Sequence, residues 1–359
     1  MGRGMRVQDE TGTVFLTLHV PVSPLVSDSS TAMTLRDAVR PILLCALLAV
    51  VGAFDEPAAD EGTVLVADKT DDVVFFVDAQ TYAVEDTVAV GRGPHEVAAH
   101  PDLGRAYVAN YEGEGTLSIL DLDTRTEVER VDLSPYSRPH GITVHPDGKS
   151  VYVTVEANQS VIEVDAETGV VRRALKTNQE GTHMLALSAD DKRLYTTNLG
   201  SGTASVLDLQ DGAVVRHLQT GEGTEGIALT PDGEELWVSN RAEDLVSIID
   251  TETLKTLDTI DVSGFPLRVY MTSDGTQALV SCARAGEVAV VDVERRTVIQ
   301  RVATGHAPVG VQITPDDRRA FVGNMRGGTV TVLDLETPSV VRQIDLGSGP
   351  DGMAFVPAG

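Results

Sequence analysis

Short runs rich in valine, isoleucine, leucine and threonine recur along the chain, and turn residues separate them. One of these runs occurs seven times, as Leu65–Asp68, Tyr107–Asn110, Tyr152–Val155, Tyr195–Asn198, Trp237–Asn240, Leu279–Cys282 and Phe321–Asn324. The ends of successive copies are 42, 45, 43, 42, 42 and 42 residues apart. Helical periodicity is not sustained in the sequence, so the pattern predicts a repeated set of strands.

Each repeat contains four strand-like runs. In one copy they are Pro139–Val144, Val151–Val155, Ser160–Val164 and Val170–Leu175, which we name strands a, b, c and d. Four strands in about 42 residues are typical of a propeller blade. The sequence therefore predicts an all-β fold, a seven-bladed β-propeller of four-stranded blades over residues 62–357.

The first and last runs predict how the ring closes. Thr63–Asp68 matches strand b of the repeat, and Gly352–Val356 matches strand a. We therefore expect the C-terminal a strand to pair with the N-terminal b, c and d strands. Such pairing completes one blade from both ends of the chain and removes long exposed sheet edges.

Two recurring turn motifs have a structural explanation. An aspartate ends strand c in every copy, at Asp78, Asp121, Asp165, Asp208, Asp250, Asp292 and Asp334. A threonine follows three residues later in five copies, and a short aspartate side chain there accepts hydrogen bonds from nearby backbone. Sequences such as Pro146-Asp147-Gly148 predict tight turns between strands a and b. We assign neither motif to chemistry.

Three sequence phrases also resemble a known family. Tyr107-Val-Ala-Asn110, His145-Pro-Asp-Gly148 and Ser247-Ile-Ile-Asp250 are similar to the YVTN-repeat, or YncE-like, β-propellers of bacteria and archaea. The resemblance covers residues 62–357 and implies an exported propeller. It does not imply one function, because the same fold supports many activities.

The N-terminal region has the pattern of an export signal. Arg36 and Arg40 precede the short apolar run Pro41–Val51, and small residues lead to a predicted cleavage site after Ala53. The apolar run is short for a transmembrane helix, although an uncleaved anchor is the alternative. The regions expected are an N-terminal extension at 1–32, a signal peptide at 33–53 and a linker at 54–61, with translation starting at Met1 or Met33. We therefore expect a periplasmic or secreted protein.

Composition narrows the classes of partner. The chain has 359 residues and a formal net charge of −26, from 28 basic and 54 acidic residues. We expect no nucleic-acid partner, because phosphate binding needs a basic surface. We also expect a monomer without stable membrane insertion after signal cleavage. Two cysteines exclude a disulfide scaffold and a thiolate zinc cluster.

One position of the repeat departs from turn chemistry. Near the start of strand a, the aligned residues are His95, His140, His183, Glu225, Leu267, Val309 and Asp351. Strand a lines the channel of a propeller, so these residues are expected at one channel mouth. Five candidate ligands then form a continuous arc, from Asp351 to Glu225. The glycines that follow in several copies are expected to keep the mouth open.

Three converging imidazoles suit a divalent transition metal such as copper, zinc or iron. We therefore predict His95, His140 and His183 as metal ligands. Glu225 is a further ligand or a general base, and a bound metal polarises a carbonyl or lowers the pKa of water. Arg268, in the next column, is a candidate for binding a substrate carboxylate or phosphate, and its alternative role is pairing with Glu96 or Glu225.

Two functional hypotheses are compatible with the sequence. The favoured one is a metal or ligand site at the channel mouth that supports lyase, hydrolase or oxidase chemistry on a small anionic substrate. The structural alternative is that the three histidines fill the channel mouth and form hydrogen bonds there, without binding a ligand. The functional alternative is a non-catalytic periplasmic or cell-surface module that binds a protein or glycan. Secondary candidates on the same face are Arg92, Tyr111, Tyr136, Arg138, Glu156, Glu180, His306 and Met325.

Overall fold

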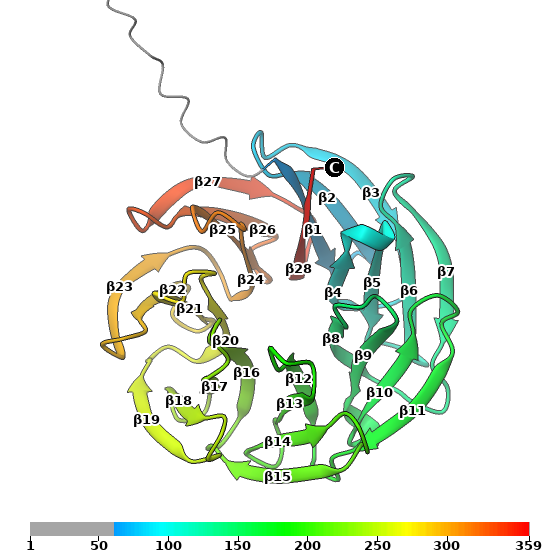
Figure 1. Cartoon of the computed structure of the whole chain (residues 1–359). Helices are drawn as coiled ribbons and strands as arrows, with labels where there is room; N and C mark the ends of the chain where they lie inside the picture. Colours follow the sequence, from blue (N-terminus) through cyan, green and yellow to red (C-terminus); the bar gives the residue numbers. More distant parts are fainter. Residues whose placement is uncertain (1–60, 359) are drawn as a thin grey trace, which may run out of the picture. The chain divides into compact units, whose positions relative to one another are not determined.

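The computed structural model describes residues 61–358, and its strands extend from Gly62 to Pro357. They form seven four-stranded antiparallel sheets, which are arranged as blades around a common axis (Figure 1). The predicted all-β, seven-bladed propeller is confirmed. The predicted extension, the signal peptide and all but the last residue of the linker lie outside the described residues.

The two inner strands of each blade correspond to a and b of the repeat. The innermost strands are β4 (Pro94–His100), β8 (Pro139–Val144), β12 (Thr182–Leu187), β16 (Thr224–Leu229), β20 (Pro266–Met271), β24 (Pro308–Ile313) and β28 (Pro350–Pro357). Their neighbours are β1 (Gly62–Asp68), β5 (Arg105–Asn110), β9 (Ser150–Val155), β13 (Arg193–Asn198), β17 (Glu235–Asn240), β21 (Gln277–Cys282) and β25 (Arg319–Asn324).

The two outer strands correspond to c and d. The third strands are β2 (Val73–Asp78), β6 (Thr116–Asp121), β10 (Ser160–Asp165), β14 (Thr203–Asp208), β18 (Leu245–Asp250), β22 (Glu287–Asp292) and β26 (Thr329–Asp334). The outermost are β3 (Val84–Ala89), β7 (Thr126–Asp132), β11 (Val171–Lys176), β15 (Val214–Gln219), β19 (Thr256–Asp261), β23 (Thr297–Ala303) and β27 (Ser339–Asp345). Two short 3-10 helices, η1 (Pro101–Leu103) and η2 (Glu156–Asn158), follow β4 and β9.

The two ends of the described chain close the ring. Strand β28 pairs antiparallel with β1, with Leu65 opposite Ala354, and the resulting sheet has the order β28-β1-β2-β3 (Figure 1). The predicted closure is therefore confirmed.

The core lies between neighbouring blades, where the apolar faces of the middle strands meet. Tyr107 of β5 and Ile162 of β10 are both fully buried and belong to one such cluster, although they come from different blades. The aspartates that end strand c cap turns as expected: the Asp78 carboxylate accepts from the Thr81 backbone at 2.6 Å and from its hydroxyl at 2.7 Å. These polar ends are structural.

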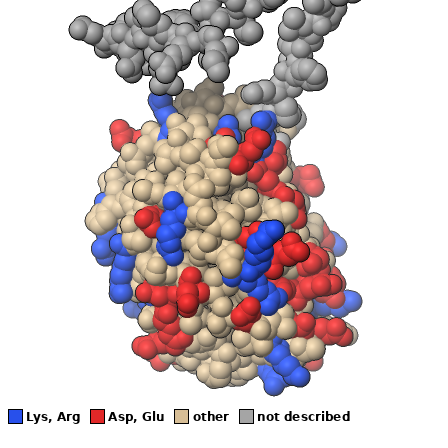
Figure 2. Space-filling view, turned by 90° about the vertical axis from the view of Figure 1, so that its left-hand side faces the viewer, with Lys and Arg blue, Asp and Glu red and all other residues tan. Residues whose placement is uncertain are grey.

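Charged side chains of both signs are interspersed on the side of the molecule shown in Figure 2. That side carries acidic clusters and separate basic residues, without an extended basic region. Within residues 61–358, the structure contains no helix with the length and apolar character needed to cross a membrane.

Candidate metal and ligand site

The seven residues that align near the start of strand a, which we call the strand a column, line one cavity at one end of the propeller. The cavity has a volume of about 550 Å³, and its lining includes His95, His140, His183, Glu225, Leu267, Val309 and Asp351. The structure thus brings together the three histidines that the sequence predicts as ligands, with Glu225 and Arg268 beside them.

A β-bulge places each of these side chains. The pairing of β8 with β9 shifts between Pro139 and Ile142, and the same irregularity occurs in the other innermost strands. His140 lies inside the shifted segment of β8. Bulges bend a strand locally and redirect its side chains, which is why they are frequent beside functional sites.

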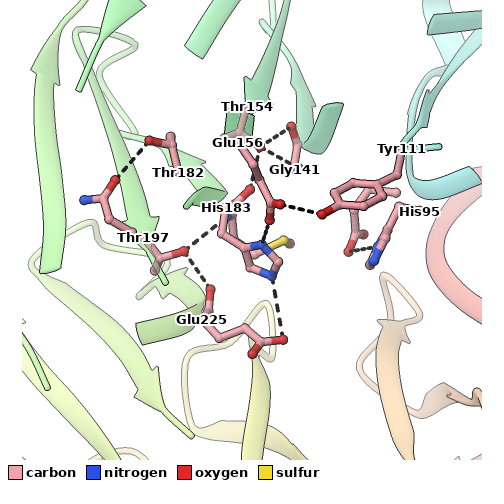
Figure 3. Close-up of polar contacts among 12 residues, drawn as sticks. His95, Tyr111, Gly141, Thr154, Glu156, Thr182, His183, Thr197 and Glu225 are labelled. Atoms are coloured by element: carbon pink, nitrogen blue, oxygen red, sulfur yellow. Dashed lines mark hydrogen bonds and ion pairs between the residues drawn. The ribbon is translucent and has the colours of Figure 1, made fainter. Parts of the chain in front are cut away.

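Hydroxyl groups on the second strands tie these bulges together (Figure 3). The Thr154 hydroxyl accepts from the Gly141 backbone at 2.8 Å and donates to the His183 carbonyl of the next blade at 2.5 Å. The Thr197 hydroxyl likewise donates to the Glu225 carbonyl at 2.7 Å. Each bridge fixes the backbone of one column residue to the preceding blade.

The glycines beside the column allow neighbouring blades to approach. A Cβ at Gly141 would lie 2.6 Å from the His183 carbonyl oxygen, and one at Gly310 would overlap the Asp351 carbonyl oxygen. The structure therefore gives these glycines a role other than the expected one of keeping the mouth open. They are required because the innermost strands pack backbone against backbone.

The three histidines form a stack. The ring centroids of His95 and His140 are 3.8 Å apart, and those of His140 and His183 are 3.7 Å apart. His140, in the middle, is 1% exposed, and neither of its ring nitrogens has a hydrogen-bond partner among residues 61–358. Unpaired buried polar groups are costly, at about 1–3 kcal/mol each, so this arrangement calls for an explanation.

His95 lies at the end of the stack nearest the blade formed by β28, β1, β2 and β3. The Lys69 ammonium is 3.2 Å from His95 Nε2, and an Asp351 carboxylate oxygen is 3.4 Å from Nδ1. Burial, reinforced by nearby cations, holds the pKa of His95 well below its usual value. Burial and the neighbouring imidazoles do the same to the pKa of His140. Both rings are therefore neutral at pH 7, which is the form that ligates metals.

His183 has carboxylates on both sides (Figure 3). Its Nδ1 lies 2.5 Å from Glu156 Oε1, and the other oxygen of Glu156 accepts from the Tyr111 hydroxyl at 2.7 Å. Its Nε2 lies 3.7 Å from a Glu225 oxygen. Burial alone lowers the pKa of His183, but the two carboxylates outweigh it and the net direction is upward.

Two sets of side chains have their ligand atoms close enough to share an ion. One contains His95, Glu96 and His140, and the other contains His140, Glu156 and His183. In each set the candidate atoms lie within 4.8 Å of one another. Imidazole and carboxylate groups together suit zinc, copper and iron. His140 is common to both sets, and neither of them contains all three predicted histidines.

Arg268 forms the alternative pairs foreseen from the sequence. It is 3% exposed and donates to Glu96 at 2.9 Å and to Glu225 at 3.1 Å, across the channel axis. Arg241 also donates to Glu225. Burial raises the pKa of Glu225, but His183 and the two arginines lower it to about 2. So acidic a carboxyl is a weak general base at neutral pH, and the catalytic roles of Glu225 and Arg268 stay predictions.

Several cavity residues were missed by sequence analysis: Lys69, Arg241, Phe265, Arg284 and Arg326. The four cations share a signal, because each lies one or two positions after the second strand of its blade. An alignment of these two positions across the repeats is the sequence signal that would indicate them. Of the secondary candidates, His306 and Met325 line the cavity, and Tyr111 and Glu156 support His183.

The fold and the cavity define a seven-bladed β-propeller with histidines at one mouth of its axis. The family model described as YNCE-like beta-propeller matches residues 56–319, and the chain belongs to this family. No curated protein matches the sequence.

Solved structures share the fold at low sequence identity. Hydrazine synthase of Kuenenia stuttgartiensis is 24% identical, with a TM-score of 0.70 over 77% of this chain and 93% of that one. The periplasmic gluconolactonase PpgL of Pseudomonas aeruginosa is 19% identical, with a TM-score of 0.70 over 83% and 99%. A functionally unknown protein of Desulfotomaculum acetoxidans is 13% identical, with a TM-score of 0.73 over 83% and 100%. These likenesses concern the fold.

Proposed function

We propose that this protein is an exported propeller that binds a divalent transition metal through His140 together with His95 or His183, and that it acts on a small anionic substrate there. The observation that carries the proposal is His140, which is buried between two imidazoles, and both of its ring nitrogens are unpaired in the described range of the chain. A metal ion would bind one of these two nitrogens through its lone pair. The hydrogen bond of His183 to Glu156 is the type of contact that orients a metal-binding imidazole.

The supporting residues have distinct roles in this proposal. Glu156 and Glu225 hold the His183 ring, and Lys69 and Asp351 hold His95. A bound ion would supply a Lewis acid that polarises a substrate oxygen. The substrate would enter from the open side of the cavity. Arg268 holds the carboxylates of Glu225 and Glu96 in place, which keeps the bottom of the cavity rigid.

Metal analysis of the full chain tests this proposal. We expect one equivalent of bound metal after dialysis against zinc or copper, and a loss of affinity of at least a hundredfold in His140→Ala. His145→Ala is the matched control, because His145 follows the other end of the same strand, β8. Absence of stoichiometric metal from the wild type, or equal binding by His140→Ala, would contradict the proposal and leave the non-catalytic interaction module.

Turnover is measured separately. The metal-loaded protein is assayed with small acids, esters and lactones, and we expect activity that the His140→Ala variant lacks. Metal binding without turnover on any of them would reduce the proposal to a binding protein.

A further inference from the structure

The cavity is chemically divided into two halves. The histidines come from β4, β8 and β12, on consecutive blades. The other four blades place cations at the rim, on the loops after β1, β17, β21 and β25: Lys69, Arg241, Arg284 and Arg326. With Arg268, the lining holds five Lys or Arg side chains against two carboxylates, Glu225 and Asp351. This excess is opposite in sign to the net charge of −26 of the chain.

Two of these cations have no carboxylate partner. Lys69, Arg241 and Arg268 pair with acidic residues of the cavity. In contrast, no hydrogen bond or ion pair links the side chain of Arg284 or Arg326 to any residue of the described range 61–358. Both are exposed, yet both line the cavity.

Arg284 is nevertheless held in place. Its guanidinium carbon lies 3.8 Å from the centroid of the Phe265 ring, and that of Arg241 lies 5.3 Å from the same ring. Stacking on an aromatic face orients a guanidinium and leaves its N–H groups available at the edge. A carboxylate can accept two parallel hydrogen bonds from such an edge.

Below these arginines the cavity wall is apolar. Leu267 and Val309 occupy the two column positions without polar groups, and Ala307 and Met325 lie beside them. The lining thus changes from cationic at the rim to apolar on one wall and to imidazole on the other. A ligand that fits this order has an anionic end, an apolar body and a polar group facing the histidines.

We propose that the cavity binds a small organic carboxylate, with its carboxylate on Arg284 and Arg326 and its apolar body against Leu267 and Val309. The inference rests on the proposed function in one respect, since the opposite end of the ligand faces the proposed metal. Its contacts with the arginines and the apolar wall are independent of that metal. It gives the substrate class that the metal site would act on.

Calorimetric titration of the full chain with hexanoate tests the anionic end. We expect binding of hexanoate and none of hexanamide, its neutral counterpart. The double variant Arg284→Gln/Arg326→Gln should lose at least tenfold in affinity, because each arginine supplies a charge-assisted hydrogen bond. The matched control is Arg216→Gln/Arg342→Gln, which removes two exposed arginines from the outermost strands and should bind as the wild type does.

A chain-length series tests the apolar body. From acetate to butyrate to hexanoate, the affinity should rise about three- to fourfold for each added methylene group. Inorganic phosphate should bind more weakly than hexanoate. Equal affinity across the series, equal affinity for phosphate, or unchanged binding in the Arg284→Gln/Arg326→Gln variant would overturn the inference.

The His140→Ala variant separates the two proposals. If it loses metal but hexanoate binding still requires the two arginines, the inference stands whatever becomes of the metal site. If metal binds through the histidines while hexanoate shows no dependence on the arginines, the inference is overturned and the proposed metal site remains.

Discussion

His140 differs from Asn198, another buried polar residue, in its hydrogen bonding. Asn198, for example, is also fully buried, but its amide donates to the hydroxyls of Thr203 and Ser205 at 3.0 and 2.8 Å. Within the described part of the chain, both nitrogens of His140 lack such partners, although Tyr111 packs edge-on at 5.9 Å between ring centroids. A side chain retained only to fill the mouth would be expected to find a hydrogen bond. This contrast favours a ligand role.

Arg268 gives a prediction about stability at the same scale. Replacement by Met should destabilise the fold by about 3–5 kcal/mol, because Glu96 and Glu225 would remain buried without their shared cation. The free energy of unfolding in urea at pH 7 measures the effect. Arg342→Met, an exposed residue of β27, is the control and should change it by less than about 0.5 kcal/mol. A loss below about 1 kcal/mol in Arg268→Met would contradict the buried network.

The repeated elements could be predicted from sequence because they are local. Strand positions, the aspartates that end strand c and the a–b turns all follow from alternation and turn chemistry within about 42 residues. The cavity could be predicted from the sequence only in part. The strand a column was visible in the alignment of repeats, whereas Arg284 and Phe265 come from different loops and meet only through the geometry of the blade. The ion pairs of Arg268 with Glu96 span 172 positions, beyond any sequence spacing rule.

The turn aspartates predict a dependence of stability on pH. The backbone N–H and hydroxyl of Thr168, with Arg172, lower the pKa of Asp165 to about 2. Five further aspartates of the set also have lowered pKa values: Asp78, Asp121, Asp250, Asp292 and Asp334. A lowered folded-state pKa stabilises the fold above the unfolded value of about 4, and this contribution is lost as the pH falls toward 2.

Urea unfolding at pH 5, 4 and 3 measures this dependence. The midpoint of the wild type should fall over this range, and Asp165→Asn should be less stable at pH 5 but approach the wild type as the pH decreases. Asp345→Asn, at an exposed position at the end of β27, is the control and should keep the wild-type slope. A constant difference between Asp165→Asn and wild type at all three pH values would refute this explanation.

At the scale of the whole molecule, ring closure makes the blades interdependent. Strand β28 completes the first blade through its pairing with β1, and it contacts β4 and β24 of the neighbouring blades. Deletion of residues 350–359 should therefore abolish the single cooperative thermal transition, and it also removes Asp351 from the cavity. Circular dichroism on heating measures this. Deletion of residues 358–359 alone should leave the midpoint within a few degrees, and an equal midpoint for both truncations would argue against closure by β28.

The distribution of charge also belongs to the whole molecule. Thirteen acidic residues are built into the repeated turns, seven at the end of strand c and six in the a–b turns at Asp102, Asp147, Asp190, Asp232, Asp274 and Asp316. The net charge of −26 thus arises in part from the architecture. The net charge does not indicate the cationic half of the cavity, because a total charge contains no information about where the charged residues lie.

The most direct test of the metal site is a crystal structure of the full chain soaked in zinc, with diffraction recorded on both sides of the zinc absorption edge. We expect an anomalous peak at the channel mouth, about 2.0–2.1 Å from a ring nitrogen of His140 and of at least one neighbouring histidine. That peak should be absent from His140→Ala crystals and present in His145→Ala crystals. Wild-type crystals without a peak at His140, or with zinc only at surface sites, would contradict metal binding at the channel mouth.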